Sequence, residues 1–287
     1  MKIYSIKDLD DMKVIKWRLT DFCNYHCSYC IRRPIAFSQA LSYDMECCNE
    51  ALPHIISIAK QLSERFNCKV KIDLIGGEIS CSDTTKEIIA ELASNDCIGK
   101  INITTNLSRN IEWYKELTNY PISITASFHP EEAILSEFLD KALTLSKLCQ
   151  FKCETVITKE ATHIDEFVSF CEDNGIYYMC EENLFDETLR GQARKNIKET
   201  PRYLVNDKLY FNTRNEFIKK YGDNGIAFNT TGFKCSKDYD YVYVDRNKVV
   251  TCFGTFDIKD YNLNDKPRLC EKGHCTLCGH ISLNKCN

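Results

Sequence analysis

Cysteine is the residue type with the most evident chemistry in this sequence. The chain has 18 cysteines among 287 residues, and three of them follow one another as Cys23-x3-Cys27-x2-Cys30. Thiolates at this spacing can hold three irons of a 4Fe-4S cluster and leave the fourth iron open to an external ligand. One alternative is a zinc site with His26 as the fourth ligand, although tetrahedral zinc sites usually join two separated pairs of ligands. The other is a group of thiols that only pack.

A second group of cysteines lies near the C-terminus. Cys235 and Cys252 flank a stretch that alternates like a β-hairpin, and Cys275 and Cys278 form a C-x2-C pair. Four thiolates from a hairpin and such a pair make a closed metal site, which suits either an iron–sulfur cluster or zinc. The spare cysteines of this region are Cys270 and Cys286.

The elements that must position these cysteines are short β-rich runs that alternate with amphipathic helical stretches. The predicted strands are Val14–Leu19, Val70–Ile75, Ile101–Thr105, Ile122–Ser127, Lys152–Ile157 and Ile176–Cys180. The predicted helices are Met45–Phe66, Thr84–Ala93, Ile111–Leu117, Glu131–Leu148 and Ile164–Asp173. This alternation implies parallel βα units, and six strands instead of eight predict a partial barrel. Site residues are then expected at the carboxyl ends of the strands.

The pattern changes after residue 183. We expect a helix over Asp207–Tyr221 and a hairpin over Tyr239–Cys252, with Asn247 at positive φ in its turn. The predicted fold is therefore α/β, a partial (β/α)6 TIM-like barrel with a small C-terminal Cys-rich β-hairpin module. The predicted domains are the barrel, 1–183, a connecting segment, 184–230, and the Cys-rich module, 231–287.

Charge and hydropathy narrow the class of protein. The 37 Lys and Arg against 41 Asp and Glu give a formal net charge of −4, which argues against a nucleic-acid partner. The sequence has neither an apolar signal segment at its start nor a run of apolar residues long enough to span a membrane. We therefore expect a soluble, cytoplasmic protein whose thiols are reduced, and reduced clustered cysteines favour metal binding over disulfides.

Together, these motifs resemble the signature of the radical S-adenosylmethionine superfamily. Cys23, Cys27 and Cys30 match its cysteine motif, and Tyr29 matches the aromatic residue that often precedes the last cysteine. The run 76–78, Gly-Gly-Glu, follows the second predicted strand, where the family carries a GGE motif. The resemblance covers the predicted barrel and implies a cluster whose open iron binds S-adenosylmethionine.

The resemblance also implies a chemistry and a set of cofactor contacts. An electron from the cluster would cleave S-adenosylmethionine to methionine and a 5′-deoxyadenosyl radical, which abstracts hydrogen from unactivated carbon. Gly76 and Gly77 would let the backbone approach the methionyl group, and Glu78 would bind its ammonium. Asn106 and Ser127, which end the third and fourth predicted strands, would contact the ribose or the carboxylate.

The C-terminal cysteines resemble a Twitch module, the shortened relative of SPASM domains, with one auxiliary 4Fe-4S cluster. Their spacing is similar to that in radical dehydrogenases of aminoglycoside cyclitol synthesis, which implies Cys235, Cys252, Cys275 and Cys278 as ligands. A low-potential electron donor such as a flavodoxin or ferredoxin is expected from the family.

The sequence therefore favours an oxidoreductase that removes two electrons from a small molecule such as a sugar or cyclitol. Substrate-facing candidates at or just beyond the predicted strand ends are His129, Glu154, Tyr178 and Glu181. One alternative is a maturase that crosslinks or epimerises a peptide or modifies a protein. It ranks second because few residues precede the first strand, where a leader-binding domain would lie. The other alternative is a noncatalytic zinc or iron–sulfur protein, which metal analysis would distinguish.

Overall fold

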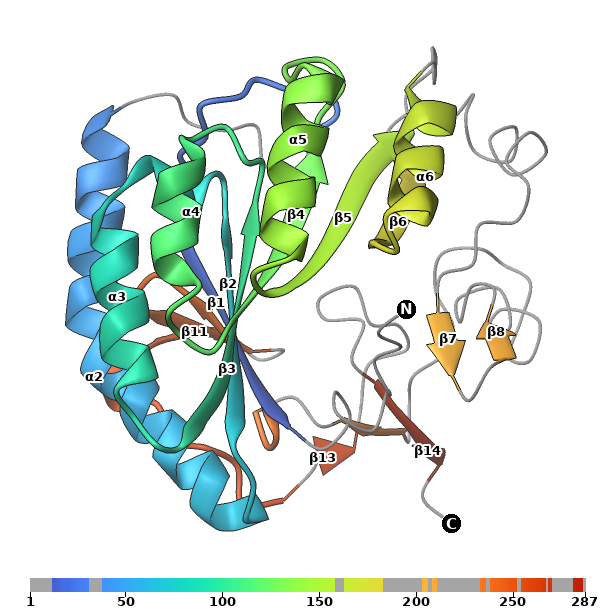
Figure 1. Cartoon of the computed structure of the whole chain (residues 1–287). Helices are drawn as coiled ribbons and strands as arrows, with labels where there is room; N and C mark the ends of the chain where they lie inside the picture. Colours follow the sequence, from blue (N-terminus) through green and yellow to red (C-terminus); the bar gives the residue numbers. More distant parts are fainter. Residues whose placement is uncertain are drawn as a thin grey trace.

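The computed structural model describes residues 12–30, 38–157, 163–182, 203–205, 208–210, 233–235, 238–251, 254–266, 268–269 and 281–285. Its main feature is a nine-stranded sheet with the strand order β12-β11-β10-β1-β2-β3-β4-β5-β6 (Figure 1). The strand pairs from β10 through β1 to β6 are all parallel, whereas β11 pairs antiparallel with both β10 and β12. In the described part of the chain, β6 and β12 are the edges of this sheet, so it stays open.

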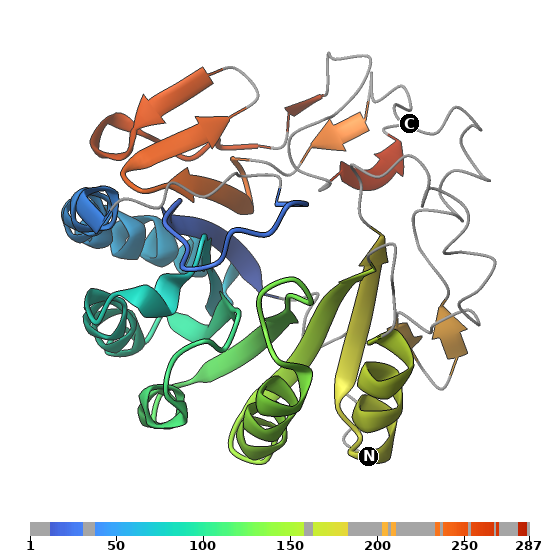
Figure 2. The ribbon, with the colours of Figure 1, turned by 90° about the horizontal axis from the view of Figure 1, so that it is seen from above.

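Five helices cover one face of the sheet. The strands are β1 (Lys13–Thr20), β2 (Val70–Gly76), β3 (Ile98–Thr105), β4 (Ile122–Phe128), β5 (Gln150–Ile157) and β6 (Tyr177–Glu182). The helices are α2 (Ser38–Phe66), α3 (Thr84–Ala93), α4 (Ile111–Leu117), α5 (Leu135–Ser146) and α6 (Ile164–Asp173). Seen from above, the strands form an arc with these helices outside it (Figure 2). The predicted α/β class and partial barrel are confirmed.

Alternation along the strands produces this arrangement because successive side chains point to opposite faces. Ile15, Trp17 and Leu19 on β1 are fully buried and belong to the core that packs against the helices. The residues between these buried positions face the concave side of the arc, and many of them are polar, such as Asp73 on β2 and Asn102 on β3. The apolar face therefore packs against the helices, and the more polar face lines the concave side of the arc.

The predicted C-terminal hairpin forms, and it joins the main sheet. Its strands are β10 (Tyr241–Asp245) and β11 (Lys248–Thr251), followed by β12 (Gly254–Asp257), and β10 pairs in parallel with β1. The side chains of Val242, Val244 and Val249 are fully buried and belong to the barrel core, which explains the docking. The residue at positive φ in the turn is Arg246, at 54°, and not Asn247 as predicted. The domain boundary at residue 231 stays a prediction.

Two small sheets complete the described chain. One has the order β13-β9-β14, with β9 at Phe233–Cys235, β13 at Arg268–Leu269 and β14 at Ile281–Lys285. The other pairs β7 (Tyr203–Val205) with β8 (Lys208–Tyr210). The predicted helix Asp207–Tyr221 is wrong over Lys208–Tyr210, which pair as a strand, and its other residues lie outside the described part of the chain. Among the described helices, none combines the length and the apolar character needed to span a bilayer.

Candidate active site

The three clustered cysteines lie on one loop at the carboxyl end of β1. This cysteine loop, residues 21–30, begins directly after Thr20, whose hydroxyl accepts a hydrogen bond from the Phe22 N–H at 2.9 Å. A turn brings the Cys30 N–H to the Cys27 carbonyl at 3.1 Å. The Cys23 sulfur accepts the Tyr25 N–H at 3.4 Å. The predicted position at the carboxyl edge of the sheet is thus the one that the structure shows.

All three cysteines of the loop are free thiols. Burial raises the pKa of Cys23 to about 12 and that of Cys27 to about 11, so both thiols carry protons until a metal replaces them. Within the described residues, no three His, Cys, Asp or Glu side chains converge on a position for a single metal ion. In a 4Fe-4S cluster each thiolate binds a different iron, so the loop does not need such a convergence to hold one.

Gly76 and Gly77 let the end of β2 lie against the start of the cysteine loop. A Cβ on Gly77 would stand 2.0 Å from the Phe22 carbonyl oxygen, and one on Gly76 would stand 2.6 Å from the Thr20 carbonyl oxygen. The Gly77 N–H donates to the Thr20 carbonyl at 2.8 Å, and the Glu78 N–H donates to the Phe22 carbonyl at 2.7 Å. This backbone packing requires both glycines, and the predicted contact with a methionyl group stays a prediction.

Glu78 is a fully buried carboxylate that joins the ends of β2 and β3. Its Oε1 accepts the Ser80 N–H at 2.9 Å and the Thr105 hydroxyl at 2.7 Å, and its Oε2 accepts the Asn106 N–H at 2.6 Å. Burial raises the pKa of Glu78, and the three donated hydrogen bonds oppose that rise in part. The carboxylate thus fixes the carboxyl edge from inside, and its predicted contact with an ammonium group stays a prediction.

We expect Glu78→Gln to destabilise the protein by about 1–3 kcal/mol in free energy of unfolding. Three hydrogen-bond donors point at the two carboxylate oxygens of Glu78. Glutamine replaces one of these oxygens by an NH2 group, which is itself a donor, so at least one of the three donors would lose its acceptor. Denaturant unfolding of the metal-free protein measures the loss. Glu112→Gln, on the exposed side of α4, is the matched control and should unfold as the wild type does. Equal stability of both variants would contradict this role of Glu78.

Asn106 is 4% exposed and lies against the cysteine loop. Its Nδ2 donates to the Asn24 Oδ1 at 3.1 Å, and its Oδ1 accepts the Ser108 N–H at 3.0 Å. The Cys81 thiol contacts the same Asn24 oxygen at 3.7 Å. The sequence predicted that Asn106 contacts the cofactor, but it did not indicate Asn24, because no local motif shows that these two asparagines are hydrogen-bonded.

The segment after β4 holds the cysteine loop from another side. The Glu132 Oε1 accepts the His26 N–H at 2.9 Å, and the Glu131 carboxylate accepts both the N–H and the hydroxyl of Ser28 at 2.6 Å. The helix predicted from Glu131 therefore begins later, at Leu135, because residues 130–133 turn to present these carboxylates. His26, the zinc ligand of the alternative assignment, is exposed.

His129 packs between two tyrosines of the cysteine loop. Its Nδ1 lies 3.2 Å from the Tyr29 hydroxyl, and its ring is stacked on that of Tyr29 with a centroid distance of 6.1 Å. The Tyr25 ring meets it edge-on at 6.0 Å. Burial lowers the pKa of His129 to about 4, so this imidazole is neutral at neutral pH. The geometry gives His129 and Tyr29 a part in holding the loop, and their predicted contacts with substrate and cofactor stay predictions.

The other predicted site residues, the cofactor contact Ser127 and the substrate candidates of β5 and β6, lie on different faces of the sheet. Ser127 on β4 and Glu154 on β5 are register partners on the concave side, and Glu154 forms an ion pair with Lys152. Tyr178 instead points to the helix layer, where it is 8% exposed and its hydroxyl donates to Glu172 of α6 at 2.9 Å. This corrects its predicted place on the substrate side. Glu181 lies on β6, and its side chain is outside the described residues.

Polar contacts link neighbouring strands on the concave face. The Asn102 Oδ1 accepts the hydroxyls of Ser123 at 3.0 Å and Thr125 at 3.2 Å. Lys71 and Asp73 form an ion pair at 2.7 Å on β2. These groups satisfy one another's hydrogen bonds, as buried polar groups must, and Ser123 and Thr125 are nearly fully buried.

The predicted auxiliary ligands lie largely beyond the described part of the chain. The backbone of Cys235 ends β9, and β11 ends at Thr251, directly before Cys252. Residues 252, 275 and 278 and the Cys235 side chain are outside the described residues, as are the spare residues 270 and 286. The auxiliary site therefore stays a prediction.

The comparisons with known proteins identify a fold. No family model matches the sequence, and no curated protein matches it significantly. A crystal structure of SuiB from Streptococcus suis matches with a TM-score of 0.50 and 13% identity over 84% of this chain and 60% of that one. SuiB bound to S-adenosylmethionine matches with a TM-score of 0.51 and 13% identity over 92% and 65%. The chain thus spans less than two thirds of the SuiB chains, and it shares their fold.

A structure of BtrN in complex with AdoMet and 2-DOIA matches with a TM-score of 0.44 and 12% identity, over 87% of this chain and 79% of that one.

Proposed function

We propose that this chain is a radical S-adenosylmethionine enzyme in which Cys23, Cys27 and Cys30 hold a 4Fe-4S cluster with one open iron. The observation that carries the proposal is the position of the three free thiols on a loop at the carboxyl edge of the sheet, held by β2, β3 and the segment after β4. The superfamily motif and the fold shared with S-adenosylmethionine-bound SuiB support it.

The chain's own residues orient the cofactor and shape its surroundings. When bound, the cluster supplies the electron that splits S-adenosylmethionine into methionine and a 5′-deoxyadenosyl radical. The backbone of Gly76 and Gly77 and the hydroxyl of Ser127 lie at the same edge, where they would contact the methionyl and ribose groups. Glu78 and Asn106 act in this proposal by holding that edge, since both are buried.

The reaction that we propose is a two-electron oxidation of a polar small molecule, such as a sugar or cyclitol. One hydrogen atom would leave a substrate carbon to complete 5′-deoxyadenosine, and a base would take a proton. An auxiliary cluster held by Cys235, Cys252, Cys275 and Cys278 would supply an acceptor for the second electron. The partly exposed side chains of Ser127 and Glu154 on the concave face support a polar substrate, and Glu154 is the candidate base. A flavodoxin or ferredoxin would supply the first electron.

Metal analysis after anaerobic reconstitution tests the proposal. We expect about eight irons and eight sulfides per chain, together with 5′-deoxyadenosine when S-adenosylmethionine and dithionite are added. About four irons with zinc would keep the radical chemistry and make the C-terminal site structural. A protein with zinc, no iron and no cleavage would contradict the proposal and leave a metal-binding protein.

The auxiliary site has its own test in Cys275→Ala. Because this residue is a proposed ligand of the auxiliary cluster alone, we expect the variant to lose about four irons per chain and to keep S-adenosylmethionine cleavage. Cys270→Ala, which changes a spare cysteine of the same region, should keep all the iron. Full iron content in Cys275→Ala would show that this residue is not a ligand.

A further inference from the structure

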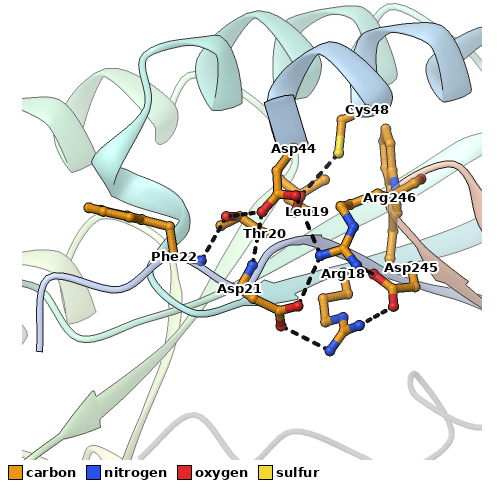
Figure 3. A network of polar contacts seen from close by, with 10 residues as sticks. Arg18, Leu19, Thr20, Asp21, Phe22, Asp44, Cys48, Asp245 and Arg246 are labelled. Carbon is orange, nitrogen blue, oxygen red and sulfur yellow. Dashed lines mark hydrogen bonds and ion pairs between the residues drawn. The ribbon is translucent and has the colours of Figure 1, made fainter. Parts of the chain in front are cut away.

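A network of charged side chains lies where β1 passes into the cysteine loop (Figure 3). This Arg246 network consists of Arg18, Asp21, Asp44, Asp245 and Arg246. Its members come from β1 and the first residue of the loop, from α2, and from the β10–β11 hairpin. Elements far apart in the sequence thus meet at the start of the proposed cluster site.

Arg246 is the centre of the network. Its guanidinium lies 2.9 Å from the Asp21 Oδ2, 3.4 Å from the Asp44 Oδ1 and 3.3 Å from the Asp245 Oδ1. The main-chain N–H of Arg246 donates to the Arg18 carbonyl at 2.7 Å, and the main-chain carbonyl of Arg246 accepts the Trp17 indole N–H at 2.8 Å. Positive φ is unfavourable for an arginine, and these side-chain and main-chain contacts offset that cost.

Asp44 connects Arg246 to the start of the cysteine loop. Its side chain is nearly buried, and its Oδ2 accepts the Thr20 hydroxyl at 2.7 Å and the Asp21 N–H at 3.2 Å. The Asp21 Oδ1 accepts from Arg18 at 2.9 Å. Residue 21 is therefore held through its main chain by Asp44 and through its side chain by both arginines.

The network is also close in sequence to both proposed metal sites. Cys23 is two residues beyond Asp21, and Cys252 directly follows β11, the strand that leaves the Arg246 turn. Without Arg246, Asp21 and Asp245 would share the Arg18 guanidinium, and Asp44 would lose the ion pair that it forms with Arg246, at the start of a loop that is proposed to hold an anionic thiolate cluster. Like charges at that distance repel, and the loop would lose its attachment to the hairpin.

We propose that Arg246 is a positioning residue that fixes the start of the cysteine loop to the C-terminal hairpin, so that the loop retains its cluster. This inference rests on the proposed function, because it assumes that the loop binds iron. Arg246 acts through Asp21 and Asp44, and among the described residues its polar contacts do not include Cys23, Cys27 or Cys30.

Iron release to a chelator under anaerobic conditions tests the inference. The Cys275→Ala background removes the proposed auxiliary cluster, so the remaining iron reports on the cysteine loop. The variants are Arg246→Gln, which removes the charge, and Arg246→Lys, which keeps the charge but not the planar fork that reaches several carboxylates. Lys13→Met is the matched control, because Lys13 pairs with Asp240 at 3.6 Å at the opposite end of the same β1–β10 pair.

We expect Arg246→Gln to release iron on the order of 10-fold faster than the parent protein, Arg246→Lys to be intermediate, and Lys13→Met to match the parent. Equal release from Arg246→Gln and the parent would overturn the inference. So would equally fast release from Lys13→Met, since hairpin docking in general would then explain the effect. A parent protein that takes up no iron would contradict the proposed function instead.

A second variant covers the case in which Arg246→Gln does not fold, which the loss of a cooperative unfolding transition would reveal. Asp21→Asn removes the charge on the loop side of the contact, including its ion pair with Arg18, and leaves Arg246 its partners Asp44 and Asp245. Faster iron release from a folded Asp21→Asn variant supports the inference, and release at the parent rate overturns it.

Discussion

Cys27→Ala lowers the formation of 5′-deoxyadenosine by at least about 100-fold in the presence of S-adenosylmethionine and dithionite. Cys27 is the middle thiol of the cysteine loop and is nearly buried, so its loss leaves two ligands for a cluster that needs three. Chromatographic quantitation of 5′-deoxyadenosine after anaerobic reconstitution measures the effect.

Cys68→Ala is the matched control for Cys27→Ala. Cys68 is also a free, partly buried thiol, but it lies just before β2, at the opposite end of the sheet from the cysteine loop. We expect this variant to form 5′-deoxyadenosine at the wild-type rate. Wild-type cleavage by Cys27→Ala would mean that the loop does not hold the catalytic cluster.

Gly77→Ala destabilises the protein by about 3 kcal/mol or more and displaces the cysteine loop. The new Cβ would stand 2.0 Å from the carbonyl oxygen and 2.5 Å from the carbonyl carbon of Phe22, and backbone atoms cannot rotate away as a side chain can. Movement of the loop would also break the hydrogen bonds that join residues 77 and 78 to it. Denaturant unfolding and iron content report the two effects separately.

Gly175→Ala separates this clash from the general cost of replacing a glycine. Gly175 ends α6 at a φ of 62°, and a Cβ there would meet nothing within 4 Å. We expect a loss of about 1 kcal/mol from the backbone conformation alone, with unchanged iron content. If the Gly77→Ala variant lost no more stability than Gly175→Ala and bound iron normally, the end of β2 and the start of the cysteine loop would not pack as described.

The strands and most helices of the barrel could be predicted because their signals are local. Thr84–Ala93, Ile111–Leu117 and Ile164–Asp173 begin and end as the periodicity of apolar residues indicates. The position of the cysteine motif also followed from sequence order alone, since parallel strands bring their carboxyl ends to one edge.

The contacts that hold the cysteine loop could not be predicted in the same way. Glu131 and Glu132 read locally as the start of a helix, yet they bind N–H groups about a hundred residues earlier in the chain. The residue at positive φ in the hairpin turn could not be predicted from local sequence either. Asn247 has the better intrinsic preference for positive φ, but contacts from β1 place Arg246 there.

The face of β6 was also ambiguous in the sequence. Apolar or aromatic residues occur at both parities from Ile176 to Cys180, so alternation does not fix which of them face the helices. In the fold, the Tyr178 ring packs against Phe167 of α6, and the Tyr178 hydroxyl donates a hydrogen bond to Glu172. Packing against α6 therefore decides the orientation of this strand.

Electron paramagnetic resonance of the reconstituted, dithionite-reduced protein, recorded before and after addition of S-adenosylmethionine, tests the central claim most directly. We expect the signal of a reduced 4Fe-4S cluster that shifts on addition of S-adenosylmethionine, because the amine and carboxylate would bind the open iron. The shift should be absent from Cys27→Ala and present in Cys68→Ala. A cluster signal that S-adenosylmethionine leaves unchanged, or a protein that binds zinc and gives no signal, would contradict the claim.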